Sequence, residues 1–167
     1  MVRVKLKDKV CEKYRFWNVE DDWWKDTYYW IEDEASERGF DNFKFEEFDL
    51  YRRDWTVETD FNVKKLIENS KKLTKEQKDI VNRLLEEELI EVDGDGSDEF
   101  NWYWNEETRD ATEEEKEATE ILEDEVNEKL QDFIRESMDK LEKEYEYLIS
   151  DEGILENFEA NGFEFDK

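Results

Sequence analysis

The feature that most constrains the fold of this chain is a long amphipathic pattern in its C-terminal third. Apolar residues recur, mostly at steps of three and four, between residues 113 and 149, and acidic residues lie between them. The apolar positions are Ala118, Leu122, Val126, Leu130, Phe133, Met138, Leu141, Tyr145 and Leu148. Because this spacing matches the α-helical period, it predicts one helix of roughly 55 Å that begins at a capping box of Thr112 and Glu115.

A helix of this length must bury its apolar face against a sheet or against a second copy of the chain. Its lack of clean heptads favours the sheet, with a homodimer as the alternative. Two segments of alternating apolar and charged residues predict that sheet, as hairpins near 43–61 and 89–104. The alternation changes phase between Phe45 and Phe48, which predicts a β-bulge. The expected fold class is therefore α+β, a small antiparallel sheet packed with helices, including one long C-terminal helix near 113–149.

Periodicity and end signals predict further, shorter helices. Residues 21–38 have an apolar face and are followed by Gly39, which is typical of a helix end. Two more helices are expected over residues 62–72 and 75–90, the second opened by Thr74 and Gln77 as a capping box. A last helix is expected to begin at Ser150 or Asp151 and to close at Asn161-Gly162.

The N-terminal residues Val2, Val4 and Leu6 alternate with basic residues. This alternation predicts a short strand, with a charged lead-in to a helix as the alternative. No proline and only five glycines interrupt the chain, so no flexible linker is expected. At 167 residues the chain is predicted to form a single acidic α+β domain, residues 1–167.

Charge and aromatic content oppose each other in this composition. The chain has 52 acidic and 25 basic side chains, a net charge of −27, which by itself would favour disorder. Seven Trp, seven Tyr and eleven Phe counter that tendency, because each buried ring removes a large apolar area from water. The lone Cys11 excludes an intramolecular disulfide, and no signal peptide or membrane span is recognisable. We therefore expect a folded protein of the cytoplasm.

The residue types argue against catalysis. The chain has no histidine, the commonest general base and metal ligand, and it carries no phosphate-binding loop or nucleophile elbow. We expect no enzyme, no cofactor and no metal, with a carboxylate-only metal enzyme as the distant alternative. The segment Asp93–Glu99 starts like a calcium loop, but its spacing fails at the required glycine and glutamate. A hairpin turn is the preferred interpretation, and weak calcium binding is the alternative.

The acidic excess is concentrated in residues 105–167, which hold 24 acidic and 7 basic side chains. Such a surface attracts a positively charged partner or keeps a protein soluble. Along the 113–149 helix the acids are spaced similarly to DNA phosphates, so they could occupy a basic nucleic-acid-binding surface. The same charge would repel nucleic acid itself, and neither direct nucleic-acid binding nor membrane binding is expected. The candidate partner-binding residues are Glu113, Glu117, Glu120, Asp124, Glu128, Asp132, Glu136 and Asp139.

Two stretches of the sequence carry a resemblance. Residues 13–24, KYRFWNVEDDWW, run on through FDLYR at 48–52, and residues 145–165 read YEYLISDEGILENFEANGFEF. They resemble small acidic proteins encoded by bacteriophages and prophages, some of them described as antitoxin-like. The likeness covers both ends of the chain and not its middle. The family has no agreed activity, so the resemblance implies a phage origin and assigns no site residues.

A phage origin suggests a function by analogy with acidic phage proteins that imitate DNA. We expect a non-catalytic anti-defence inhibitor that binds a host defence protein of the restriction, BREX or CRISPR type through its acidic surface. The alternative is an antitoxin or another protein-interaction inhibitor that uses exposed aromatic residues, with the charge serving solubility. Trp23 and Tyr103 are the candidate aromatic contacts.

Overall fold

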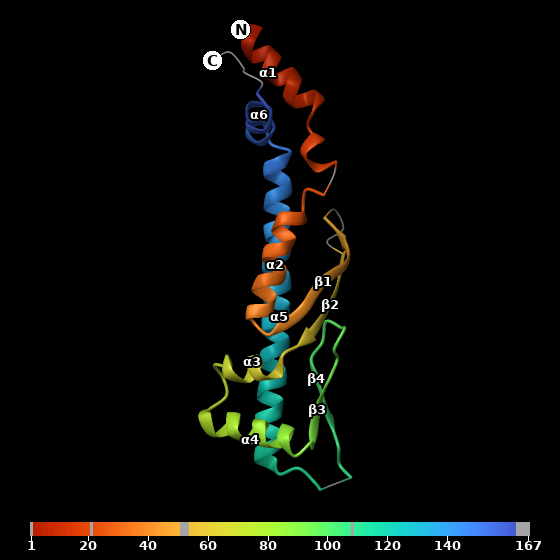
Figure 1. Ribbon diagram of the computed structural model, residues 1–167, viewed down its shortest axis with the longest axis vertical. Helices are drawn as coiled ribbons and strands as arrows, with labels where there is room; N and C mark the ends of the chain where they lie inside the picture. Colours follow the sequence, from red (N-terminus) through yellow and green to blue (C-terminus); the bar gives the residue numbers. More distant parts are fainter. Residues whose placement is uncertain (1, 21, 51–53, 108, 163–167) are drawn as a thin grey trace. The chain divides into compact units, whose positions relative to one another are not determined.

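The computed structural model describes residues 2–20, 22–50, 54–107 and 109–162. Helices and short hairpins make up these residues, which confirms the predicted α+β class (Figure 1). The chain divides into two compact units. Unit 1 contains residues 1–30 and 137–167, and unit 2 contains residues 31–136. Two compact units can belong to one domain or to two, so the single domain stays a prediction.

Two antiparallel hairpins lie in unit 2, as predicted. Strands β1 (Phe40–Asp49) and β2 (Asp54–Phe61) form the first, and β3 (Ile90–Asp93) and β4 (Asn101–Trp104) form the second. Each hairpin is its own two-stranded sheet, and a bridge between Thr59 and Ser97 links them. The linked hairpins present a continuous set of rings, because Phe61 lies 5.1 Å from Phe100.

The register of the first hairpin shifts in two places. The shift between Phe45 and Glu47 confirms the bulge predicted from the change of alternation. A second shift, between Asp41 and Lys44, surrounds Asn42, whose φ of 52° is in the left-handed region. Asparagine tolerates that conformation better than most residues, so no glycine marks this bulge in the sequence. The bulge around Asn42 allows Phe40 and Phe43, three residues apart, to be buried in the same core.

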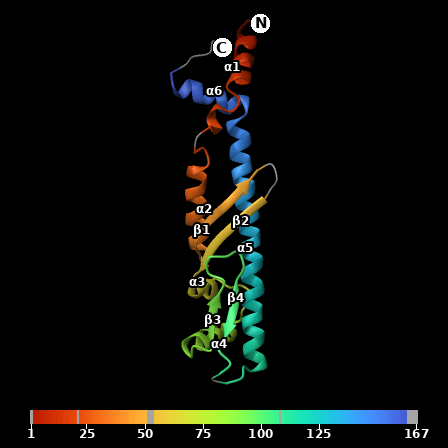
Figure 2. The ribbon, with the colours of Figure 1, turned by 90° about the vertical axis from the view of Figure 1, so that its right-hand side faces the viewer.

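The long helix α5 (Glu113–Leu148) begins at the predicted capping box. Within unit 2 its apolar face packs on both hairpins, which lie alongside it in Figures 1 and 2. Phe133 contacts Phe43 of β1 with ring centroids 5.1 Å apart. The Asn127 amide donates to the Phe100 carbonyl at 2.9 Å, and its oxygen accepts the Phe100 backbone N–H at 2.7 Å. This part of the helix therefore packs on the sheets, as preferred over pairing with a second copy.

Two short helices, α3 (Val63–Glu68) and α4 (Lys75–Glu86), connect the hairpins. The capping box of Thr74 and Gln77 is confirmed at the start of α4. Both helices are shorter than predicted. Helix α4 ends because Glu88 adopts a left-handed φ of 57° and the Leu89 N–H bonds back to the Leu84 carbonyl at 3.0 Å.

Helix α2 (Lys25–Glu37) begins later than the predicted residue 21, which lies outside the described residues. Gly39 follows the end of the helix, as predicted, with a φ of 96°. A Cβ atom there would lie 2.8 Å from a methyl group of Leu66, so both the backbone conformation and the space require glycine.

Unit 1 corrects one prediction. Residues 2–7 belong to helix α1 (Val2–Lys13) and form no strand. The α1 residue Cys11 is buried with Ile154 and Phe158 of α6 (Asp151–Ala160), and both views show α1 beside α6. The alternative prediction, a charged lead-in to a helix, is therefore correct. The 3-10 helix η1 (Trp17–Val19) follows, and Ser150 caps α6 as predicted.

Among the described residues, no helix is both long enough and apolar enough to cross a membrane.

Candidate functional site

The eight predicted acids form a line of exposed side chains on α5, here called the acidic stripe. Each of the eight is exposed, and the Glu113 side chain is 95% exposed. Their spacing of three or four residues keeps them on one face of the helix, away from the apolar stripe. Seven of them belong to unit 2, and Asp139 belongs to unit 1. The structure therefore makes every predicted stripe residue accessible.

Part of the stripe is neutralised by nearby cations. Four ion pairs are described, Glu113 with Lys116 at 3.9 Å, Glu128 with Lys72 at 3.0 Å, Asp132 with Arg135 at 3.1 Å, and Glu136 with Arg38 at 3.1 Å. In the part of unit 2 that the structure describes, Glu117, Glu120 and Asp124 have no ion-pair partner. The uncompensated charge of the stripe is therefore concentrated between residues 117 and 124.

The Glu123 carboxyl is next to this unpaired part of the stripe in the sequence. Burial raises the pKa of Glu123 above its ordinary value, and the negative charges of Asp124, Glu99 and Glu120 raise it further. Negative potential is therefore high where the stripe is unpaired. A cationic side chain from a partner would relieve the repulsion among these carboxylates.

Glu115, predicted only as a capping residue, also forms a buried ion pair. Its carboxylate accepts two hydrogen bonds from the Arg109 guanidinium, at 2.7 and 2.8 Å, and one from the Thr112 backbone N–H at 2.9 Å. These donors, Arg109 first, lower the pKa of Glu115 to about 2, although burial opposes them. This acid stabilises the start of α5 and is unavailable to a partner.

We predict a pH-dependent contribution of Glu115 to stability. Its folded pKa of about 2 lies below the ordinary value of 4.5, so the stabilisation is complete above pH 4.5 and is lost as the pH falls towards 2. Urea unfolding of the wild type and of Glu115→Gln should show a large difference at pH 6 that shrinks steadily below pH 4.5. A difference that is constant from pH 6 to pH 2 would contradict this assignment.

Glu125 is the second buried acid of α5, and its structural role was not predicted. Its carboxylate accepts hydrogen bonds from the Ser70 hydroxyl at 2.9 Å, from the backbone N–H groups of Lys71 and Lys72 at 3.0 Å, and from the Lys129 ammonium at 3.1 Å. Burial alone would raise its pKa, but these donors lower it below the ordinary value. Glu125 therefore fixes the loop between α3 and α4 against α5.

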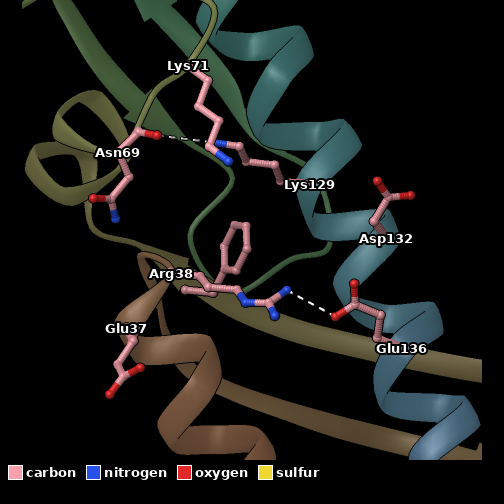
Figure 3. Close-up of a pocket in the computed structure, with 8 residues that line it drawn as sticks. Glu37, Arg38, Asn69, Lys71, Lys129, Asp132 and Glu136 are labelled. Carbon is pink, nitrogen blue, oxygen red and sulfur yellow. Dashed lines mark hydrogen bonds and ion pairs between the residues drawn. The ribbon is translucent and has the colours of Figure 1, made fainter.

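This loop forms one wall of a pocket of about 480 Å³ in unit 2 (Figure 3). Three of its side chains are basic and three are acidic. The lining residues are Glu37, Arg38, Phe40, Asn69, Lys71, Lys129, Asp132 and Glu136. Figure 3 shows the Lys71 and Lys129 side chains ending on the same side of the pocket, while the Arg38 guanidinium is directed towards Glu136. This site was not predicted, because the six lysines between residues 64 and 78 do not indicate which of them lines a pocket.

The candidate aromatic contacts differ in exposure. Tyr103 is 58% exposed on β4, whereas Trp23 is half-buried with its ring 5.4 Å from that of Tyr145. Other exposed aromatic side chains, all in unit 1, were not predicted as contacts. They are Phe16, Trp17, Tyr29, Trp30 and Tyr147. Trp30 is covered on one face by the Lys140 ammonium, 3.1 Å from the ring centroid.

The turn at residues 93–99 connects β3 and β4, as the preferred interpretation predicted. Its Asp95 carboxylate accepts the Phe61 backbone N–H at 2.9 Å, so this side chain fastens the turn to β2. In the described part of the chain, no three acidic or cysteine side chains are grouped to hold a metal ion.

The acidic stripe and the mixed-charge pocket are thus two places in unit 2 where ionised side chains gather and a binding partner could contact them. Neither contains a nucleophile beside a base among the described residues. Searches with this chain find no matching family model, no similar curated protein and no similar solved structure.

Proposed function

We propose that this protein is a non-catalytic, phage-encoded inhibitor that binds a basic nucleic-acid-binding surface of a host defence protein in the bacterial cytoplasm. The observation that carries the proposal is the exposed, unpaired group of Glu117, Glu120 and Asp124, beside a Glu123 carboxyl whose pKa is raised. A basic groove lined by arginine and lysine would compensate this charge. Attraction of that kind speeds association and weakens as salt increases.

The geometry of the stripe supports imitation of a phosphate backbone. Successive stripe acids are three or four residues apart, a rise of roughly 4.5–6 Å, whereas phosphates repeat every 3.4 Å or so along one DNA strand. The match is one of scale and sign, which is sufficient for a surface that recognises phosphates by charge. Nucleic acid itself would be repelled by the same carboxylates.

A second candidate function is supported by unit 1. Phe16 and Tyr29 are each 54% exposed, and large exposed rings are typical of protein-interaction surfaces. An antitoxin or another protein inhibitor that binds through these rings would form a contact that withstands salt. The two candidates therefore differ in their expected salt dependence.

An affinity capture from bacterial lysate tests the proposal. The full chain serves as bait at low and high salt, and retained proteins are identified by mass spectrometry. We expect one DNA- or RNA-handling protein that is retained at low salt and released at high salt. Retention of a partner without a nucleic-acid-binding surface, unaffected by salt, would contradict the proposal and favour the aromatic surface of unit 1.

We predict that charge reversal of the unpaired stripe residues abolishes this binding. The triple variant Glu117→Lys, Glu120→Lys and Asp124→Lys should weaken binding to the captured protein by roughly 100-fold or more, because close charge pairs across an interface couple strongly. Its far-ultraviolet circular dichroism and melting temperature should stay near the wild-type values, since all three side chains are exposed.

The matched control reverses three exposed acids elsewhere in unit 2, Asp79→Lys, Glu86→Lys and Glu91→Lys. Both variants change the net charge equally, so only the position of the charge differs. The control should keep most of the affinity. Equal loss in both variants would show that net charge alone matters, and it would overturn the assignment of the stripe.

A further inference from the structure

The chain contains one basic segment in an otherwise acidic unit 2. Residues 64–78 contain six lysines and two glutamates, a local charge of +4 in a chain of −27. Several of these lysines serve the fold. Lys65 donates to the Ser36 carbonyl at 3.0 Å, Lys72 pairs with Glu128, and Lys78 donates to the Glu68 carbonyl at 3.1 Å.

Lys71 differs from these lysines. Its backbone N–H is held by Glu125 at 3.0 Å, and its side chain lines the 480 Å³ pocket. Across residues 2–20, 22–50, 54–107 and 109–162, no carboxylate or carbonyl oxygen binds its ammonium group. A buried carboxylate thus fixes the backbone of Lys71, whose exposed side chain has no ion-pair partner in the described part of the chain.

The other two cations of the pocket are held in place by the fold. Arg38 stacks on the Phe133 ring at 4.8 Å and is paired with Glu136 through Nη1 at 3.1 Å and with Glu34 through Nε at 3.6 Å. Lys129 is held by Glu125 at 3.1 Å and by the Asn69 carbonyl at 3.4 Å. Figure 3 draws both of the pocket contacts, Arg38 with Glu136 and Lys129 with Asn69. These interactions orient the cations before any ligand arrives, which lowers the entropic cost of binding.

The acidic side chains that line the pocket do not neutralise its two lysines. Glu136 is paired with Arg38, and Asp132 is paired with Arg135 at 3.1 Å. The Glu37 side chain points away from Lys71 and Lys129 in Figure 3. The side of the pocket where the two lysines end is therefore cationic.

We propose that this pocket binds a small phosphate ester, with the Lys71 ammonium as the principal contact and the Lys129 ammonium as the second. A phosphate monoester is a compact dianion with three acceptor oxygens, which suits two ammonium groups that end on the same side of a pocket. The pocket volume is in the range of small-molecule sites. This inference goes beyond the proposed function and does not depend on the partner of the acidic stripe.

The test is an amide NMR titration of the full chain at low salt with adenosine monophosphate, with inorganic phosphate and with adenosine. We expect saturable shifts at Asn69, Lys71 and Lys129 with adenosine monophosphate, at a Kd of roughly 1 mM or below. Adenosine should cause no such shifts. Lys71→Ala should weaken the binding at least tenfold, by removing a charge-assisted contact.

Lys75→Ala is the matched control, because Lys75 is an exposed lysine of the same segment that does not line the pocket. It should bind the nucleotide like the wild type. Three results would overturn the proposal: no saturable shifts up to about 10 mM ligand, equal binding of adenosine, or equal weakening by Lys71→Ala and Lys75→Ala. Inorganic phosphate binding at the same residues would assign the contact to the phosphate group alone, in support of the proposal.

Discussion

Replacing Phe133 with alanine is expected to lower the free energy of unfolding by about 3–5 kcal/mol. Phe133 is 1% exposed and is the point where α5 meets the first hairpin. Its ring lies 5.1 Å from Phe43 and 6.3 Å from Phe40, and Arg38 covers it. Truncation removes these contacts together and leaves a cavity that a bulged hairpin and a regular helix cannot close.

Urea unfolding followed by circular dichroism measures this loss. Tyr103→Ala is the control, since it removes a comparable aromatic group that is 58% exposed, and it should change the free energy of unfolding by less than about 0.5 kcal/mol. If the two variants lose equal stability, Phe133 is not the centre of the core described here.

The second large effect is expected at Glu125. Glu125→Ala leaves the Ser70 hydroxyl, the N–H groups of Lys71 and Lys72, and the Lys129 ammonium without their common acceptor. Losing the acid of this network costs about 3 kcal/mol. The Ser70 hydroxyl and the two backbone N–H groups lose their acceptor, whereas the Lys129 ammonium, whose side chain is 38% exposed, can turn to water. Glu125→Gln keeps the shape and one acceptor oxygen, so its loss should be smaller.

Glu128→Ala is the control for Glu125. Glu128 also bonds a lysine, but its side chain is 64% exposed, and removal of an exposed pair should leave the midpoint of unfolding nearly unchanged. Amide hydrogen exchange adds a specific readout, because Glu125→Ala should release the N–H groups of Lys71 and Lys72 while the β3–β4 hairpin stays protected. Unchanged protection at these two amides would contradict the role assigned to Glu125.

Glu125 and Phe133 differ in whether their structural role can be predicted from the sequence. The helical period identified Phe133 as a core position, because an amphipathic pattern needs no knowledge of its partner. Among the 15 acids of residues 113–149, in contrast, nothing local distinguishes Glu125 from its exposed neighbours. Its role depends on a loop that is more than 50 residues away in the sequence, and only tertiary packing brings the two together.

The sequence by itself determined the elements whose signals are local. These are the long helix and its cap, the two hairpins, the capping boxes and the helix end at Gly39, because periodicity and backbone preference act over a few residues. The N-terminal strand prediction failed because three alternating apolar residues are too short a pattern to separate a strand from the start of a helix. The helix continues to Lys13, and its Cys11 is buried against α6.

Tertiary structure alone decided how the charges are used. It neutralised Glu128 and Glu136 with cations from other elements, buried Glu115 and Glu125 among donors, and left Glu117, Glu120 and Asp124 unpaired in the described part of unit 2. It also placed Lys71 in a pocket that no spacing in the sequence indicates. Electrostatic interaction depends on distance in space and on burial, and neither quantity can be read from the order of the residues.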